Sequence, residues 1–154
     1  MCIRDSFKTT QEEFVELMNR KAVALGLERT HFTNPIGLDG EDGNHVTTAR
    51  DLAKMVKAAL QSGVFRQIVG TREITLVSQT QDRWHELTNT NELLAVLPGT
   101  TGVKTGKTDA AGECLVLTYE KSGKELLVVI LGSADRFGET QALLDWVIET
   151  NLWP

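Results

Sequence analysis

The stretch at residues 102–116, GVKTGKTDAAGECLV, contains residue types suited to binding an anion. Lys104 supplies an ammonium charge, and Thr105 and Thr108 supply hydroxyl donors. Gly106 lets a ligand approach the backbone closely, because a glycine in a strand has no side chain. A fixed charge beside open backbone can stabilise an anionic group. A lysine at a strand edge also commonly prevents aggregation, so the triplet alone leaves both interpretations open.

Arg136, in the segment SADRFGET, is a second candidate anion ligand. Its planar guanidinium can hold a carboxylate with two parallel hydrogen bonds. The alternative is a surface ion pair with Asp135 or Glu139. We expect Arg136 to stand just ahead of the last helix, in a loop bracketed by Gly132 and Gly138.

A group of His31, Asp39, Asp42 and His45 raises the question of a metal site. The stretch DGEDGN begins like a calcium loop, but Arg50 occupies the twelfth position, where a bidentate Glu belongs. The two histidines are fourteen residues apart, without zinc-like pairing. We therefore expect no metal, and instead a loop ordered by Asp and Asn turns and a histidine hydrogen bond.

Composition limits the remaining classes of function. The 154 residues carry a net charge of -5 and no run of Lys or Arg, which argues against nucleic-acid binding. No apolar run approaches the roughly 18 residues of a membrane span. Cys2 and Cys114 form no spacing motif, and we expect Cys114 to be a small buried apolar residue. Trp146 and Trp153 are expected to pack against the sheet, and no cofactor is expected.

Periodicity and capping residues predict an α+β chain with helices laid on an antiparallel sheet. Thr10 and Glu13 form a capping box before the first helix, and Ser122-Gly123 suits a tight hairpin. The second helix is expected to stop at Gly63. Helices are predicted over 10–26, 48–63 and 91–97, strands over 72–79, 83–90, 102–106, 113–120 and 125–133, and a closing helix from Gly138.

Several longer segments give the triplet a context. They are FVELMNRKAVALGLERTHFTNPIGLDG, HVTTARDLAKM, LTNTNELL, GVKTGKTDAAGECLV and RFGETQALLDW. They include two specific signatures, N-x-x-G-L and G-x-K-T-G-x-T-x-x-A-G. In order and spacing the segments resemble D-alanyl-D-alanine carboxypeptidases of the low-molecular-weight penicillin-binding type, the S11 serine peptidases, over about residues 11–152. β-Lactamases share the triplet but not these flanks.

The resemblance implies catalytic roles for consecutive residues of the predicted strand. Lys104 resembles the lysine that shapes the electrostatics of the site and assists proton transfer near the nucleophile. Gly106 would keep the strand clear for a peptide, and the backbone N–H of Lys107 resembles one of two oxyanion-hole donors. Donors of this kind stabilise the tetrahedral intermediate of acyl transfer.

The resemblance also implies a substrate. Thr105 and Thr108 look like hydroxyl donors to the terminal carboxylate of a peptidoglycan stem peptide ending in D-Ala-D-Ala, and Arg136 resembles the arginine that holds this carboxylate. β-Lactam antibiotics would acylate the same enzyme in its intact form. The expected location is extracytoplasmic, although no export signal is visible in the chain.

The sequence departs from the family because it contains no Ser-x-x-Lys and no Ser-x-Asn box. None of the serines has Lys three residues on or Asn two residues on; they stand at positions 6, 62, 78, 122 and 133. The family places both boxes upstream of the segment that begins here near Phe14. We therefore expect that this chain holds no nucleophile and shows no activity alone.

This departure sets the expected domain organisation. We interpret residues 1–6 as a non-native leader and residues 7–154 as the C-terminal part of a single transpeptidase-like catalytic domain. The N-terminal strands and the nucleophile helix would be missing, which should leave an unpaired, apolar edge on the strand at 125–133. Alternatives are a D,D-endopeptidase, a serine β-lactamase, and a non-catalytic peptidoglycan-binding module.

Overall fold

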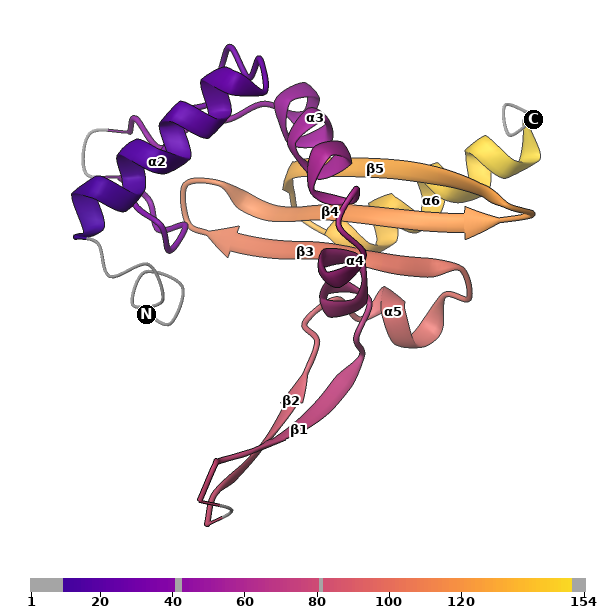
Figure 1. Ribbon diagram of the computed structural model, residues 1–154. Coiled ribbons are helices and arrows are strands. Elements are labelled where there is room, and N and C mark those ends of the chain that lie inside the picture. Colours follow the sequence, from indigo (N-terminus) through magenta and orange to yellow (C-terminus); the bar gives the residue numbers. More distant parts are fainter. Residues whose placement is uncertain (1–9, 41–42, 81, 151–154) are drawn as a thin grey trace.

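The computed structural model describes residues 10–40, 43–80 and 82–150 and confirms the predicted α+β class (Figure 1). Three helices precede the first strands, and one long helix closes the chain. The elements are α2 (Gln11–Ala24), α3 (Ala49–Ala59), α4 (Gly63–Val69), β1 (Glu73–Val77), β2 (Trp84–Thr88), α5 (Leu93–Val96), β3 (Thr100–Thr108), β4 (Gly112–Lys121), β5 (Lys124–Ser133) and α6 (Arg136–Glu149).

The first two helices start where their capping residues predict. The Thr10 backbone N–H donates to Glu13 Oε2 at 2.9 Å, and the Glu13 N–H donates to Thr10 Oγ1 at 3.2 Å. This reciprocal pair satisfies two N–H groups that the helix itself leaves free. Thr48 Oγ1 likewise accepts from the Asp51 N–H at 3.2 Å at the start of α3.

Two predicted boundaries are wrong, and a polar cap explains each. Gly63 does not stop the second helix; it is the first residue of α4, a helix that the sequence analysis missed, and the Ser62 side chain caps it. Arg136 does not precede the last helix but begins it. Asp135 is the N-cap, and its Oδ1 accepts from the Gly138 N–H at 2.9 Å.

The main sheet is antiparallel, with strand order β3-β4-β5. Positive φ angles at Ser122 and Gly123, 55° and 74°, form the predicted tight turn between β4 and β5. A bulge near Gly132, where φ is 66°, shifts the register at the far end of β5. Among the described residues β5 pairs only with β4, so its other edge is unpaired, as predicted.

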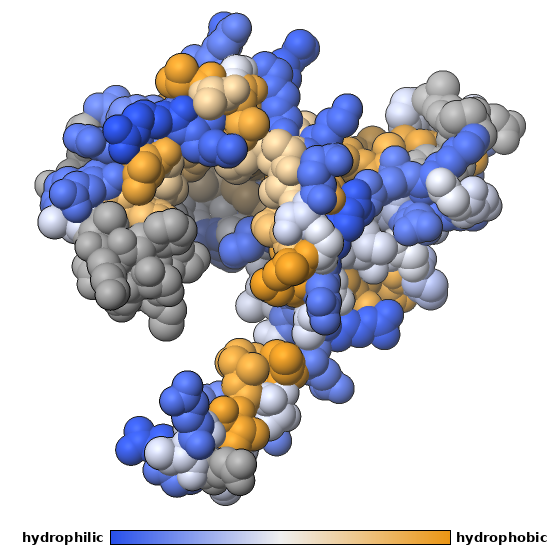
Figure 2. Space-filling model, in the orientation of Figure 1, coloured by the Kyte–Doolittle hydropathy of each residue, from blue (hydrophilic) through white to orange (hydrophobic). Residues whose placement is uncertain are grey.

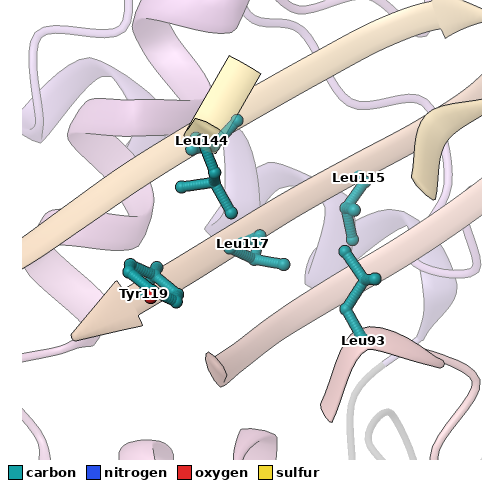
Figure 3. Packing of buried hydrophobic residues seen from close by; sticks show 6 residues of the cluster. Leu93, Leu115, Leu117, Tyr119 and Leu144 are labelled. Atoms are coloured by element: carbon teal, nitrogen blue, oxygen red, sulfur yellow. The ribbon is translucent and has the colours of Figure 1, made fainter. Parts of the chain in front are cut away.

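Both faces of β4 are covered, because its alternating side chains enter two apolar clusters. On one face the cluster shown in Figure 3 joins β4 to α5 and α6. On the other face the cluster joins β4 to α3 and β3. The buried members are, in the first cluster, Leu93, Leu115, Leu117, Tyr119, Val128 and Leu144, and in the second, Val56, Leu60, Val103 and Val116.

Two expectations about burial are wrong. Cys114 is only half-buried, because it lies between Glu113 and Leu115, where the register between β4 and β5 shifts. Trp146 is 53% exposed and does not complete the core of the described residues. Trp153 lies outside the described residues. Within the described part of the chain, no helix combines the length and apolarity needed to cross a bilayer.

Strands β1 and β2 form a separate two-stranded sheet that projects from the body as an arm (Figure 1). Its cross-strand pairs include Ile74 with Leu87 and Val77 with Trp84. All four side chains are 48% exposed or more. An isolated hairpin is only marginally stable in water, so the arm depends on its attachment at the base.

Leu117 provides a test of the core, because its side chain has no exposed surface and contributes to the first cluster. We expect Leu117→Ala to lower the free energy of unfolding by about 2–5 kcal/mol, since the cavity left in a packed core refills poorly. Urea unfolding followed by circular dichroism measures this change. Leu38→Ala is the matched control, because Leu38 is 59% exposed; an equal loss in both variants would contradict the assignment.

Candidate active site

The triplet occupies the second half of β3, held in register by β4. Lys104 lies opposite Val116, Thr105 opposite Leu115, and Lys107 opposite Glu113. The strand is longer than predicted, and it carries the triplet and Thr108 on one continuous segment.

Within the triplet, exposure divides the residues into two kinds. Lys104 and Gly106 are exposed, whereas Thr105 is only 7% exposed. The Lys104 ammonium donates to the Thr105 carbonyl, so it lies against its own strand. A charge held in this way is available to a ligand that approaches along β3.

Arg136 reaches the triplet from the first turn of α6. Its Nη1 donates to the Gly106 carbonyl at 3.0 Å, and its guanidinium lies 4.8 Å from the centre of the Phe137 ring. Residues 30 positions apart in the sequence thus meet at one end of β3. Together with Lys104 and Lys107, Arg136 brings three basic side chains to this end of the strand.

Glu113 is a site residue that the sequence analysis missed. Its Oε1 lies 2.9 Å from Lys107 Nζ, and its Oε2 accepts from the Arg136 backbone N–H at 3.4 Å. The hydrogen bond from Lys107, followed by that from Arg136, lowers the pKa of the Glu113 carboxyl. The only sequence signal is its position on β4 opposite Lys107, which requires knowledge of the register.

Thr108 stands at the end of β3 and bonds a neighbouring loop. Its hydroxyl donates to Asp39 Oδ1 at 2.7 Å and accepts from the Ala111 N–H at 3.0 Å. Asp39 Oδ2 also accepts from the Ala110 N–H at 3.4 Å. Donation from Thr108 to a substrate carboxylate therefore requires the bond to Asp39 to open.

The N-x-x-G-L signature forms the turn that presents Asp39. Asn34 Oδ1 accepts from three successive backbone N–H groups at 2.8–3.2 Å, those of Ile36, Gly37 and Leu38. Such an Asx turn is the ordering device expected for this loop. Gly37 adopts a φ of 75°, which a side chain would disfavour.

The histidines of this loop serve structure. His45 Nδ1 accepts from the Thr33 N–H at 3.1 Å, as the expected histidine hydrogen bond. Burial, together with the charge of His31, lowers the pKa of His45 and favours its neutral form. In the described residues no three His, Cys, Asp or Glu side chains are placed to hold a metal ion, and Asp42 lies outside them.

A second feature missed from the sequence is the turn Asn89-Thr90-Asn91, between β2 and α5. The Thr90 and Thr105 hydroxyl oxygens lie 2.6 Å apart. Asn91 is 2% exposed, and its Nδ2 donates to the Gly102 carbonyl at 3.2 Å. Three polar residues before a helix signal a turn but not its contact with β3.

Comparison with known sequences agrees with this geometry. Residues 2–135 match the sequence model of a family described as D-alanyl-D-alanine carboxypeptidase, Peptidase S11. The chain belongs to the S11 peptidase family. The match includes the Lys104-Thr105-Gly106 triplet and ends one residue before Arg136.

Curated relatives include carboxypeptidases and endopeptidases. The chain is 38% identical over 140 residues to the D-alanyl-D-alanine carboxypeptidase DacF of Bacillus subtilis, covering 89% of this chain and 35% of that protein. It is 34% identical over 147 residues to DacB2 of Mycobacterium tuberculosis, covering 92% and 50%. A D-alanyl-D-alanine endopeptidase of Escherichia coli is 32% identical over 145 residues, covering 92% and 46%. The chain thus spans half or less of the length of these S11 relatives.

Solved structures confirm the transpeptidase-like fold. The D-alanyl-D-alanine carboxypeptidase of Mycobacterium tuberculosis H37Rv superposes with a TM-score of 0.82 at 32% identity, covering 94% of this chain and 56% of that one. The Streptomyces K15 DD-transpeptidase gives a TM-score of 0.82 at 32% identity, covering 90% and 55%. The fold described here therefore corresponds to part of the domain in these S11 structures.

The Glu113 carboxyl provides a test of the site electrostatics. Its lowered pKa means that folding favours the ionised carboxylate. The contribution of this carboxylate to the stability of the fold is therefore present above the ordinary pKa of 4.5, and it is lost as the pH falls through the pKa of the folded state. We expect Lys107→Met to raise the pKa of Glu113 toward 4.5, as measured by NMR titration. Lys121→Met is the control, since Lys121 lies opposite Lys124; an unchanged Glu113 pKa in Lys107→Met would contradict the pairing.

Proposed function

We propose that this chain forms the substrate-binding side of a serine-type D-Ala-D-Ala carboxypeptidase. The enzyme would act on peptidoglycan stem peptides outside the cytoplasm, through an acyl-enzyme on a serine that this chain does not contain. The observation that carries the proposal is the 3.0 Å bond from Arg136 Nη1 to the Gly106 carbonyl. It places a guanidinium beside the triplet, at the end of β3 where a ligand carboxylate would be received.

Each site residue has a role in this proposal. Arg136 and the Thr105 hydroxyl bind the terminal carboxylate, and Lys104 supplies positive potential near the incoming nucleophile. Gly106 leaves the strand open, and the Lys107 N–H serves as one of two oxyanion-hole donors. Thr108 contributes a further hydroxyl once it leaves Asp39, and otherwise orders the turn after β3.

The acyl-transfer sequence needs no metal or organic cofactor. The serine oxygen attacks the carbonyl between the two D-alanines, and the oxyanion develops toward the Lys107 N–H. Collapse expels the terminal D-alanine, whose amine takes the proton that the serine gave up, and water then hydrolyses the acyl-enzyme to the free serine and the shortened peptide. β-Lactams would acylate the same serine. Fixed donors at a developing charge are commonly the largest contribution to catalysis of this type.

Open apolar surfaces support the proposal that this chain packs against the rest of a larger domain. A hollow of about 460 Å³ beside α2 is lined mainly by apolar side chains, and apolar surface is visible there in Figure 2. Elsewhere on the described part of the chain, Trp146 on α6 is 53% exposed and one edge of β5 is unpaired. Apolar patches of this kind commonly mark contact surfaces. The hollow is lined by Phe14, Leu17, Met18, Lys21, Ala22, Leu25, Leu27, Phe32 and Met55.

A D,D-endopeptidase is the second candidate, because relatives named D-alanyl-D-alanine endopeptidase align over 87–92% of this chain. An endopeptidase cleaves a cross-link rather than a free D-Ala-D-Ala end. Digestion of cross-linked and uncross-linked peptidoglycan fragments by the intact protein distinguishes the two. A β-lactamase or a non-catalytic binding module would release neither product.

Arg136→Gln tests the carboxylate role in the intact protein, meaning this chain with the upstream coding sequence that carries the nucleophile. We expect kcat/KM for D-alanine release from a D-Ala-D-Ala peptide to fall by about 10- to 100-fold, because a charge-assisted bond is lost. Arg83→Gln, on the exposed part of the arm, is the matched control. Equal activity of the two variants would contradict the role of Arg136.

The chain alone provides a complementary test. Because none of its serines stands in a Ser-x-x-Lys box, we expect no covalent labelling by a fluorescent penicillin, whereas the intact protein is labelled. Gel fluorescence after denaturation measures this. Labelling of the isolated chain would show that a serine within residues 1–154 is the nucleophile. It would overturn the proposal that this chain supplies the substrate-binding residues but not the nucleophilic serine.

A further inference from the structure

The turn Asn89-Thr90-Asn91 touches the triplet but has no role in the proposed function so far. Thr90 is exposed, whereas the Thr105 side chain that it contacts is 7% exposed. Their hydroxyl oxygens lie 2.6 Å apart, the short separation expected of an O–H···O hydrogen bond. The hydroxyl of exposed Thr90 thus lies against the hydroxyl of buried Thr105.

The two asparagines hold Thr90 in place. Asn89 Nδ2 donates to the Thr71 carbonyl at 3.0 Å, and Asn89 Oδ1 accepts from the Asn91 N–H at 2.9 Å. Asn91 Nδ2 donates to the Gly102 carbonyl on β3 itself, three residues before Thr105. The turn is thus fixed to the base of the arm on one side and to β3 on the other, so the Thr90 hydroxyl has little freedom.

A bound carboxylate determines which of the two hydroxyl groups donates its hydrogen to the other. A carboxylate only accepts hydrogen bonds, so the Thr105 hydroxyl must donate to it. The single hydrogen of Thr105 is then committed, and the 2.6 Å contact must be a bond donated by Thr90 to Thr105 Oγ1. Bonds in such a chain polarise each other, so donation from Thr90 makes Thr105 a stronger donor.

From this geometry we infer that Thr90 is a positioning residue, which orients and strengthens the Thr105 hydroxyl as a donor to the substrate carboxylate. The inference rests on the proposed function, since it assumes that a carboxylate binds at Thr105. It assigns a role to the middle residue of the Asn-Thr-Asn turn. Thr90 itself acts through Thr105, and its contribution appears only with ligands that carry the carboxylate.

The test compares acylation of the intact protein by benzylpenicillin and by its methyl ester, which lacks the carboxylate charge. We expect Thr90→Val to lower the second-order acylation rate by about three- to tenfold for benzylpenicillin, as for loss of one hydrogen bond, and less than twofold for the ester. Thr90→Ser, which keeps the hydroxyl, should restore the rate. If Thr90→Val does not fold, Thr90→Ala enters the same comparison.

Thr101→Val is the matched control. This substitution removes another hydrogen bond between two threonine hydroxyls, that from Thr101 Oγ1 on β3 to Thr118 Oγ1 on β4 at 2.8 Å. Thr101 lies at the opposite end of β3 from the triplet. We expect it to leave the ratio of the two rates unchanged. A purely structural role of Thr90 would lower both rates together, which would overturn the inference.

The outcomes separate the two proposals. If the unsubstituted intact protein is not acylated, the proposed function fails, and this inference fails with it. If it is acylated but Thr90→Val keeps the ratio between penicillin and ester, only the role of Thr90 is overturned. A change in ratio that Thr90→Ser reverses supports both.

Discussion

The pairing of β3 with β4 is the constraint on which the site depends. β4 lies at the centre of the sheet, and its alternating side chains enter apolar clusters on both faces, so its position is fixed from two sides. A shift of one residue in register would move every side chain of β3 to the other face. Burial of β4 therefore stabilises the alignment of Lys104, Thr105 and Lys107 at an open edge.

Around this strand, the cationic groups are placed by carboxylates and backbone oxygens of other elements. Glu113 holds Lys107 and the backbone of Arg136, and the Gly106 carbonyl holds the Arg136 guanidinium. Asp39, from a loop distant in the sequence, accepts a hydrogen bond from the Ala110 N–H and so orders the turn after β3. This arrangement leaves positive charge at the strand while limiting the freedom of its long side chains, which lowers the entropy lost when a ligand binds.

Local signals in the sequence predicted much of the fold, and contacts between distant segments account for what they missed. The Thr10–Glu13 capping box and the Ser122-Gly123 turn act within a few residues, so the sequence predicted both correctly. Helix α4 was missed because one serine cap within a short segment gives little periodicity. The pairing of Glu113 with Lys107 was missed because it depends on the register of β3 and β4. The contact of Thr90 with Thr105 was missed because it depends on a turn that folds back onto β3.

The position of Arg136 in the linear signature suggested its role, but its contact with Gly106 required the fold. The helix start at Arg136 depends on the Asp135 cap, which anchors the first turn of α6 next to the end of β5. A ligand role for the triplet could be proposed from family signatures, whereas the contacts of Thr105 with Thr90 and of Thr108 with Asp39 could not. Such polar contacts across more than a dozen positions have no local pattern.

Under the proposed function, one strand carries both the carboxylate donor and the oxyanion donor, and this sets a length for the substrate. Thr105 and Lys107 are two residues apart on β3, so their Cα atoms are separated by about 6.6 Å along the strand. In the proposed site, this spacing acts as a ruler for the piece of substrate between its terminal carboxylate and the carbonyl under attack. A leaving group one backbone atom longer would not match this spacing, so its carboxylate and the carbonyl under attack could not both reach their donors.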